Sequence, residues 1–163
     1  MAYTVGMVSL GCAKNQVDGE MLLASLKEGG FQPVEDPSEA DILLVNTCGF
    51  IESAKRESIE AILEGIQLKT EGTVQKVVVT GCLAERYQQE IHKELPEVDG
   101  VFGIGANGDI AAWLRAMLQE GFAQAFPEKG KMPLCGEREL STPEYFAYLK
   151  IAEGCDNRCS YCA

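Results

Sequence analysis

The sequence contains no apolar run long enough to span a membrane. A membrane-spanning helix needs about 20 consecutive, mostly apolar residues, and no stretch of the 163 residues approaches this length. The N-terminus also lacks a basic stretch followed by a long apolar one, which is the pattern of a secretory leader. We therefore expect a cytoplasmic protein without a membrane partner.

Basic residues are scarce. The chain has 14 Lys and Arg against 25 Asp and Glu, for a formal net charge of −11, and its Lys and Arg do not cluster strongly. Because neutralising phosphates dominates affinity for nucleic acid, proteins that bind it normally show a basic excess. We therefore do not expect this domain to bind nucleic acid. Solubility explains the acidic excess, and the alternative is that this part of the protein approaches a basic partner.

Histidine is nearly absent, whereas cysteine is frequent. The single histidine, His92, falls one position past an apolar stripe and is expected at the surface. There are seven cysteines. The cytosol keeps thiols reduced, so a disulfide framework is not expected there. Metal ligands or catalytic thiols are the better interpretation.

The first 120 residues alternate strand and helix patterns. This alternation predicts an α/β fold, a parallel sheet with helices on both faces. Five strands are expected, and each except the second is followed by a crossover helix, which favours the flavodoxin-like order 2-1-3-4-5. Residues 83–95 predict one of these helices, closed by Pro96. The predicted strands are 5–10, 31–34, 41–47, 76–80 and 98–104.

Three cysteines come directly after three of these strands. Cys12, Cys48 and Cys82 follow the first, third and fourth predicted strands. Parallel strands end at the same edge of a sheet, and the order 2-1-3-4-5 makes these three strands neighbours. With neighbouring strands about 4.8 Å apart, the three loops span about 10 Å, which an iron–sulfur cluster can bridge. The placement predicts a metal or cluster site.

The last 40 residues change character. Residues 121–143 contain several Pro and Gly and predict a linker, and residues 145–151 then predict a new strand. The chain stops at Ala163, one residue after a candidate ligand, where no domain could end, so we expect a longer protein. The expected organisation is a cluster-binding domain over 1–120, a linker over 121–143 and the start of a further domain over 144–163.

The second cysteine group follows the strand expected at 145–151. Cys155, Cys159 and Cys162 are separated by three and then two residues. Three thiolates on one loop can hold three irons of a 4Fe–4S cluster and leave the fourth open. A zinc knuckle would need a fourth ligand, and a redox pair of Cys159 and Cys162 would not need Cys155. The spacing resembles the signature of the radical S-adenosylmethionine superfamily, in which the open iron chelates that cofactor and residues 145–151 would open the barrel.

Across the whole chain the resemblance narrows to the methylthiotransferases. It rests on residues 9–15 (SLGCAKN), 45–52 (VNTCGFIE) and 79–82 (VTGC). The form of the first segment, with Val17 and Asp18 after it, looks like the branch that modifies an aspartate of a small-subunit ribosomal protein. Gly19 stands where that branch would have a serine.

The resemblance implies two 4Fe–4S clusters and S-adenosylmethionine as cofactors. Cys12, Cys48 and Cys82 would hold an auxiliary cluster that presents sulfur. Cys155, Cys159 and Cys162 would hold the cluster that cleaves the cofactor to a radical, with electrons from an external donor. Two alternatives stay open: a tRNA methylthiotransferase of the same family, and a non-catalytic iron–sulfur electron carrier.

Three weaker features have ordinary interpretations. Cys135 has no partner at ligand spacing and is an incidental thiol. Residues 103–108 (GIGANG) match the dinucleotide-binding string G-x-G-x-x-G, but they follow the fifth strand and not the first. A strand-to-helix turn capped by Asn107 or Asp109 is therefore expected. Lys14 and Asn15 lie beside Cys12, but spacing alone assigns them no role.

Overall fold

The computed structural model describes residues 2–128 and 136–160 of the chain. Cys135 and Cys162, both named above, lie outside the described residues. The strands are β1 (Thr4–Ser9), β2 (Gln32–Pro33), β3 (Ile42–Thr47), β4 (Lys76–Gly81), β5 (Gly100–Phe102) and β6 (Ala123–Ala125). The helices are α1 (Ala13–Glu28), η1 (Pro37–Glu39), α2 (Glu52–Thr70), α3 (Cys82–Arg86), α4 (Gln88–Glu94), η2 (Ile104–Asp109) and α5 (Ile110–Glu120).

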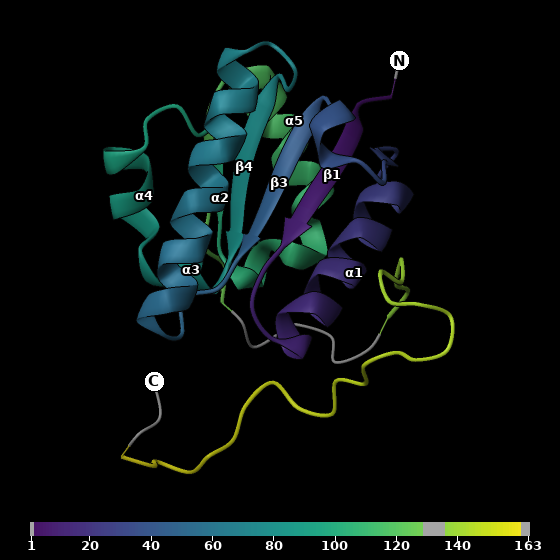
Figure 1. The fold of residues 1–163 in the computed structure, drawn as a ribbon, viewed down its shortest axis with the longest axis vertical. Helices are drawn as coiled ribbons and strands as arrows, with labels where there is room; N and C mark the ends of the chain where they lie inside the picture. Colours follow the sequence, from purple (N-terminus) through teal and green to yellow (C-terminus); the bar gives the residue numbers. More distant parts are fainter. Residues whose placement is uncertain (1, 129–135, 161–163) are drawn as a thin grey trace.

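The sheet is parallel throughout and has the order β2-β1-β3-β4-β5-β6. The predicted order 2-1-3-4-5 is confirmed, and a sixth strand extends it. The central strand β3 is buried along its whole length because it has neighbours on both edges and helices on both faces (Figure 1). Its side chains alternate between the two faces, as the pleat requires.

Two apolar clusters cover the two faces of the sheet. Ile42 and Leu44 of β3 pack with α1 and α5, whereas Leu43 and Val45 pack with α2, α3 and α4. Figure 1 shows α2, α3 and α4 together on one side of the sheet. The helices on both faces that the sequence predicts are therefore present, and the continuous apolar run of β3 follows from burial on two sides.

The linker predicted over 121–143 is not irregular throughout, because strand β6 lies within it. It pairs with β5 in the register Gly100↔Ala123 to Phe102↔Ala125. Its neighbours Phe122 and Phe126 pack on one apolar cluster, and Ala123 and Ala125 pack on the other. The segment lacks β-branched residues, so its composition favours a loop, and the available edge of β5 makes it a strand.

The predicted strand over 145–151 is wrong for the described structure. Residues 136–160 form no helix or strand. Within the described residues no strand pairs with this segment, and an unpaired strand leaves its backbone groups without partners. Three of its apolar side chains remain largely exposed: Tyr145 at 85%, Leu149 at 83% and Ile151 at 84%.

The helix expected over 83–95 is two helices, α3 and α4. The break lies at Tyr87, whose φ of −118° and ψ of 44° are not helical. Leu83 and Ile91 nevertheless bury in the same apolar cluster. The apolar residues therefore keep their four-residue spacing across the break. For this reason the sequence pattern does not show that the helix is interrupted. Among the described residues, no helix has both the length and the hydropathy needed to cross a membrane.

Candidate cluster site

The carboxyl edge of the sheet brings three cysteines together. Cys12 lies between β1 and α1, Cys48 directly follows β3, and Cys82 begins α3 directly after β4. Strands β1, β3 and β4 are hydrogen-bonded neighbours, with the pairs Ser9↔Asn46 and Thr47↔Gly81 near their ends. The arrowheads of the three strands point to one edge (Figure 1). The predicted gathering of these residues at one edge is confirmed.

A glycine beside each cysteine lets the three loops touch. Gly11 has φ +94°, and a Cβ there would lie 2.6 Å from Cβ and 2.9 Å from Sγ of Cys48. Gly81 has φ +91°, and a Cβ there would lie 2.4 Å from the Thr47 carbonyl oxygen. A Cβ on Gly49 would lie 3.2 Å from the Cys82 carbonyl oxygen. The loops therefore pack at backbone distance, which only glycine allows.

The three thiols differ in their surroundings. Cys12 is exposed and is the N-cap residue of the 16-residue helix α1. Cys48 is buried, and Cys82 is half-buried. Burial, followed by the nearby Cys48 thiol, raises the pKa of the Cys82 thiol above its ordinary value, with Cys12 adding to the rise and Lys14 opposing it. The Cys48 and Cys12 thiols therefore lie close enough to Cys82 to disfavour its charged form.

Ser58 of α2 holds the Cys48 backbone from both sides. Its hydroxyl accepts a hydrogen bond from the Cys48 N–H and donates one to the Cys48 carbonyl, both at 2.9 Å. Ser58 is fully buried. The guanidinium of Arg86 on α3 also donates to the Gly49 carbonyl at 2.9 Å. The Cys48 loop is thus fixed by the helices on both sides of it.

Asn15 links the Cys12 loop to the Cys48 loop. Its amide Nδ2 donates to the Leu10 carbonyl at 2.6 Å and lies 3.3 Å from the Thr47 carbonyl. In a second contact, the side-chain amide of Asn46 donates a hydrogen bond to the Asn15 carbonyl at 2.9 Å. A Cβ at Gly19 would lie 2.9 Å from Asn46 Nδ2 and 2.9 Å from Met7 Cε, so a serine there would require these side chains to shift. Neither Asn15 nor Ser58 is assigned a role by sequence spacing.

The donor set fits an iron–sulfur cluster better than a single ion. Within residues 2–128 and 136–160, no three His, Cys, Asp or Glu side chains converge closely enough to hold one metal ion. A 4Fe–4S cluster makes a different demand, because each thiolate ligates a different iron around a cuboid. The five cysteines of the described chain are all free, so their thiols are available as ligands. Three thiols in adjoining loops are chemically suited to this role.

The two described members of the second cysteine group are not enclosed by the surrounding chain. Cys155 and Cys159 are exposed, and Cys162 lies outside the described residues. The segment that carries them, coloured yellow, passes beyond the carboxyl ends of the strands (Figure 1). The segment that carries Cys155 and Cys159 and the three strand-end cysteines therefore lie at the same edge of the sheet (Figure 1).

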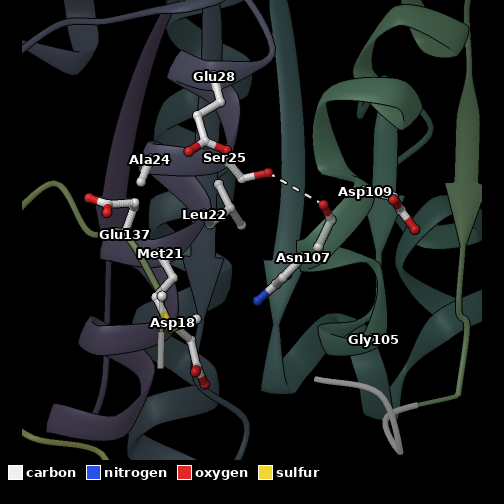
Figure 2. Close-up of a pocket in the computed structure, with 12 residues that line it drawn as sticks. Asp18, Met21, Leu22, Ala24, Ser25, Glu28, Gly105, Asn107, Asp109 and Glu137 are labelled. Carbon is white, nitrogen blue, oxygen red and sulfur yellow. Dashed lines mark hydrogen bonds between the residues drawn. The ribbon is translucent and has the colours of Figure 1, made fainter. Parts of the chain in front are cut away.

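The G-x-G-x-x-G string forms the predicted turn. Residues 104–109 are the 3₁₀ helix η2, and Asp109 occupies the N-cap position of α5 without a side-chain cap hydrogen bond. A Cβ on Gly105 would lie 2.1 Å from the Pro127 carbonyl oxygen, so packing alone requires this glycine. A cavity of about 300 Å³ separates η2 from α1 (Figure 2). Four carboxylates line it, which disfavours a phosphate ligand: Asp18, Glu28, Asp109 and Glu137.

His92 is less exposed than its position predicts. Its ring stacks on Phe122 with the centroids 3.8 Å apart. Its Nδ1 atom is buried and has no hydrogen-bond partner among the described residues. The surface expectation holds only in part: His92 is half-buried, because Phe122, the residue before β6, packs against α4.

Comparison with known proteins agrees with the motifs. Residues 4–103 match the family described as "Uncharacterized protein family UPF0004". The chain is 49% identical to a protein of Thermoanaerobacter sp. (strain X514) and 47% identical to one of Anaeromyxobacter sp. (strain K), over 97% and 99% of its length. A third relative, from Acetivibrio thermocellus, is 46% identical over 100% of the chain. All three relatives are named ribosomal protein uS12 methylthiotransferase RimO.

The chain spans only about a third of these relatives, namely 36%, 34% and 38% of their lengths. The similarity covers almost the whole chain, including both cysteine groups, and confirms the resemblance to the methylthiotransferases. The family match covers all three loops of the sheet edge. The chain therefore belongs to the uncharacterized protein family UPF0004.

Proposed function

We propose that this chain is the N-terminal, cluster-binding part of a radical S-adenosylmethionine methylthiotransferase. Its substrate is an aspartate of a small-subunit ribosomal protein. The observation that carries the proposal is the meeting of Cys12, Cys48 and Cys82 in adjoining loops at one sheet edge. Relatives named for methylthio transfer to uS12 support the substrate class.

Two cofactor sites follow from this proposal. Cys12, Cys48 and Cys82 hold an auxiliary 4Fe–4S cluster, and Cys155, Cys159 and Cys162 hold the cluster that binds S-adenosylmethionine. When bound, these groups supply reductive cleavage of the cofactor, with an external electron donor, and the sulfur that is transferred. At the first site Ser58 holds the backbone of Cys48, and the glycines beside the three cysteines let their loops pack closely.

The charge of the chain suits a basic protein partner. A formal net charge of −11 attracts a positively charged protein surface and repels nucleic acid. We accordingly favour a ribosomal protein over tRNA as the substrate, and the ribosomal substrate implies a reaction in the cytoplasm. The domain organisation stays as the sequence predicts, except that the folded part of the first domain continues through β6.

The decisive experiment separates the two sites in the complete enzyme. Replacing Cys48 with Ala should abolish methylthiolation but leave cofactor cleavage to 5′-deoxyadenosine running, because only the auxiliary site loses a ligand. Replacing Cys159 with Ala should abolish both. Mass spectrometry of ribosomal proteins and tRNA identifies the product, and chromatography measures 5′-deoxyadenosine.

Cys135→Ala is the matched control, since this thiol has no ligand role in the proposal. Iron must be counted in each variant, because a collapsed domain would imitate a catalytic defect. Normal methylthiolation by the Cys48→Ala variant would contradict the proposal. It would mean that the first three cysteines have a structural or electron-carrier role. Methylthiolated tRNA in place of uS12 would contradict the proposed substrate.

A further inference from the structure

Helix α1 buries two carboxylates beneath the C-terminal segment. Asp18 is 5% exposed and Glu20 is 2% exposed, although both lie on a helix at the side of the molecule (Figure 1). Carboxylates are almost never buried to this extent unless they are paired. Their partners come from residues 138–153, which we call the strap.

Glu20 holds the first part of the strap. Its Oε1 atom accepts hydrogen bonds from the Ser141 N–H at 3.0 Å and from the Ser141 hydroxyl at 2.8 Å. Its carbonyl oxygen accepts from the Glu139 N–H at 3.1 Å. Arg138 lies 3.6 Å from Oε2 and neutralises the charge. The strap thus supplies two hydrogen bonds to Oε1 and a positive charge near Oε2.

Asp18 holds the last part of the strap. Lys150, whose side chain is 2% exposed, lies 2.5 Å from Asp18 Oδ1, and Lys14 lies 3.0 Å from Oδ2. Glu153 pairs with Lys150 and, at 3.0 Å, with Lys14. Lys14 is two residues after Cys12, and Glu153 is two residues before Cys155. The ion pairs therefore join the neighbourhoods of the two cysteine groups.

Apolar packing explains only part of how the strap is attached, since Leu140, Phe146 and Tyr148 are about half covered, at 57%, 44% and 42% exposed. Tyr145, Leu149 and Ile151 remain more than four-fifths exposed, at 85%, 83% and 84%. The other pair between strap and helix, Lys27 with Glu139, has side chains 60% and 40% exposed. Exposed pairs contribute little, whereas removing one partner of a buried pair is strongly unfavourable. The attachment therefore depends on the buried carboxylates.

We infer that Asp18 and Glu20 are positioning residues that fix the strap against α1 and thereby set the place of Cys155 relative to Cys12. The strap also forms one wall of an open cavity of about 810 Å³ beside Cys12, through residues 139–141. The catalytic consequence rests on the function proposed above. The positioning itself is a property of the 163-residue chain and is testable without any cluster.

Hydrogen exchange of the 163-residue chain tests the positioning directly. In Asp18→Asn and Glu20→Ala, the hydrogen-bonded amides of the strap, those of Glu139, Ser141 and Phe146, should exchange about tenfold faster or more, because local opening of the strap no longer breaks a buried pair. Amides of β3 and β4 should keep their protection, which shows that the fold is intact. Glu20→Gln keeps an acceptor for Ser141 but removes the charge paired with Arg138, so its effect should be smaller than that of Glu20→Ala.

Lys27→Gln is the matched control, since it removes an exposed pair to the same strap and should change exchange less than twofold. The double variant Asp18→Asn with Lys150→Gln should exchange no faster than the faster single variant, because both remove one interaction. Unchanged strap exchange in both Asp18→Asn and Glu20→Ala would overturn the inference. An effect of Lys27→Gln equal to that of Asp18→Asn would also overturn it.

The complete enzyme separates this inference from the proposed function. Asp18→Asn should lower the ratio of methylthiolated product to 5′-deoxyadenosine about tenfold while cofactor cleavage continues. The reason is that the two cysteine groups are no longer held at a fixed position relative to each other. If the wild-type enzyme makes no methylthiolated product, the proposed function fails, and the exchange result still decides the positioning. If the exchange changes but the product ratio does not, the catalytic part of the inference is wrong.

Discussion

Gly11 is the residue whose substitution most sharply tests the packing of the cluster site. Its φ of +94° lies in the left-handed region, where an L-residue costs about 1–2 kcal/mol. Ala at this position would also place a Cβ 2.6 Å from the Cys48 Cβ and 2.9 Å from its Sγ. Overpacking of this kind costs about 1–3 kcal/mol more. We expect Gly11→Ala to lower the free energy of unfolding by about 2–5 kcal/mol, summing these two ranges, and to displace Cys48.

Gly72 provides the matched control. Its φ is +81°, and a Cβ there would meet nothing within 4 Å. Gly72→Ala should therefore lower the free energy of unfolding by only about 1–2 kcal/mol, the backbone cost alone. Urea unfolding followed by circular dichroism measures both variants, and anaerobic reconstitution measures their iron content. Only Gly11→Ala should lose iron at the auxiliary site. Equal stability losses and full iron in both variants would refute the reasoning.

Two further predictions concern hydrogen bonds. Ser58→Ala should lower the free energy of unfolding by about 1–3 kcal/mol, because it leaves the buried N–H of Cys48 unsatisfied; the exposed Ser53→Ala on the same helix should change it little, and a loss as large for Ser53 would contradict the assignment. The Ser38 hydroxyl and N–H lower the pKa of Asp36 below 3.8, so this turn gains stability above the unfolded pKa and loses it as the pH falls through the folded value. An NMR titration should show the lowered pKa, and Ser38→Ala should bring it back up; a pKa unchanged in that variant would contradict the cause.

The strand order and the meeting of three cysteines could be predicted because both depend on local patterns. Apolar runs mark the strands, and parallel strands put the following residues at one edge. Strand β6 could not be predicted in this way, because Ala123–Ala125 is a strand only through the free edge of β5. The segment 145–151 has a strand composition but finds no partner strand within the described residues. Tertiary contacts decide both cases.

The roles of Ser58 and Asp18 could not be predicted from the sequence for a related reason. Ser58 meets Cys48 across 10 residues, and Lys150 meets Asp18 across 132. Polar contacts over such separations leave no periodic signal along the chain. One usable signal was present, however. A glycine adjoins each of the three strand-end cysteines, and the structure shows that these glycines let the loops approach one another.

The central claim is that Cys12, Cys48 and Cys82 together hold one cluster. It is tested most directly by iron and sulfide analysis of the anaerobically reconstituted chain, with Cys155, Cys159 and Cys162 replaced by Ala so that one site remains. We predict about four irons per chain, with the absorption and paramagnetic resonance of a 4Fe–4S cluster after reduction. Serine at any one of Cys12, Cys48 or Cys82 should remove most of this iron, whereas serine at Cys135 should not. Undiminished iron in any of the three variants, or no iron in the parent chain, would contradict the claim.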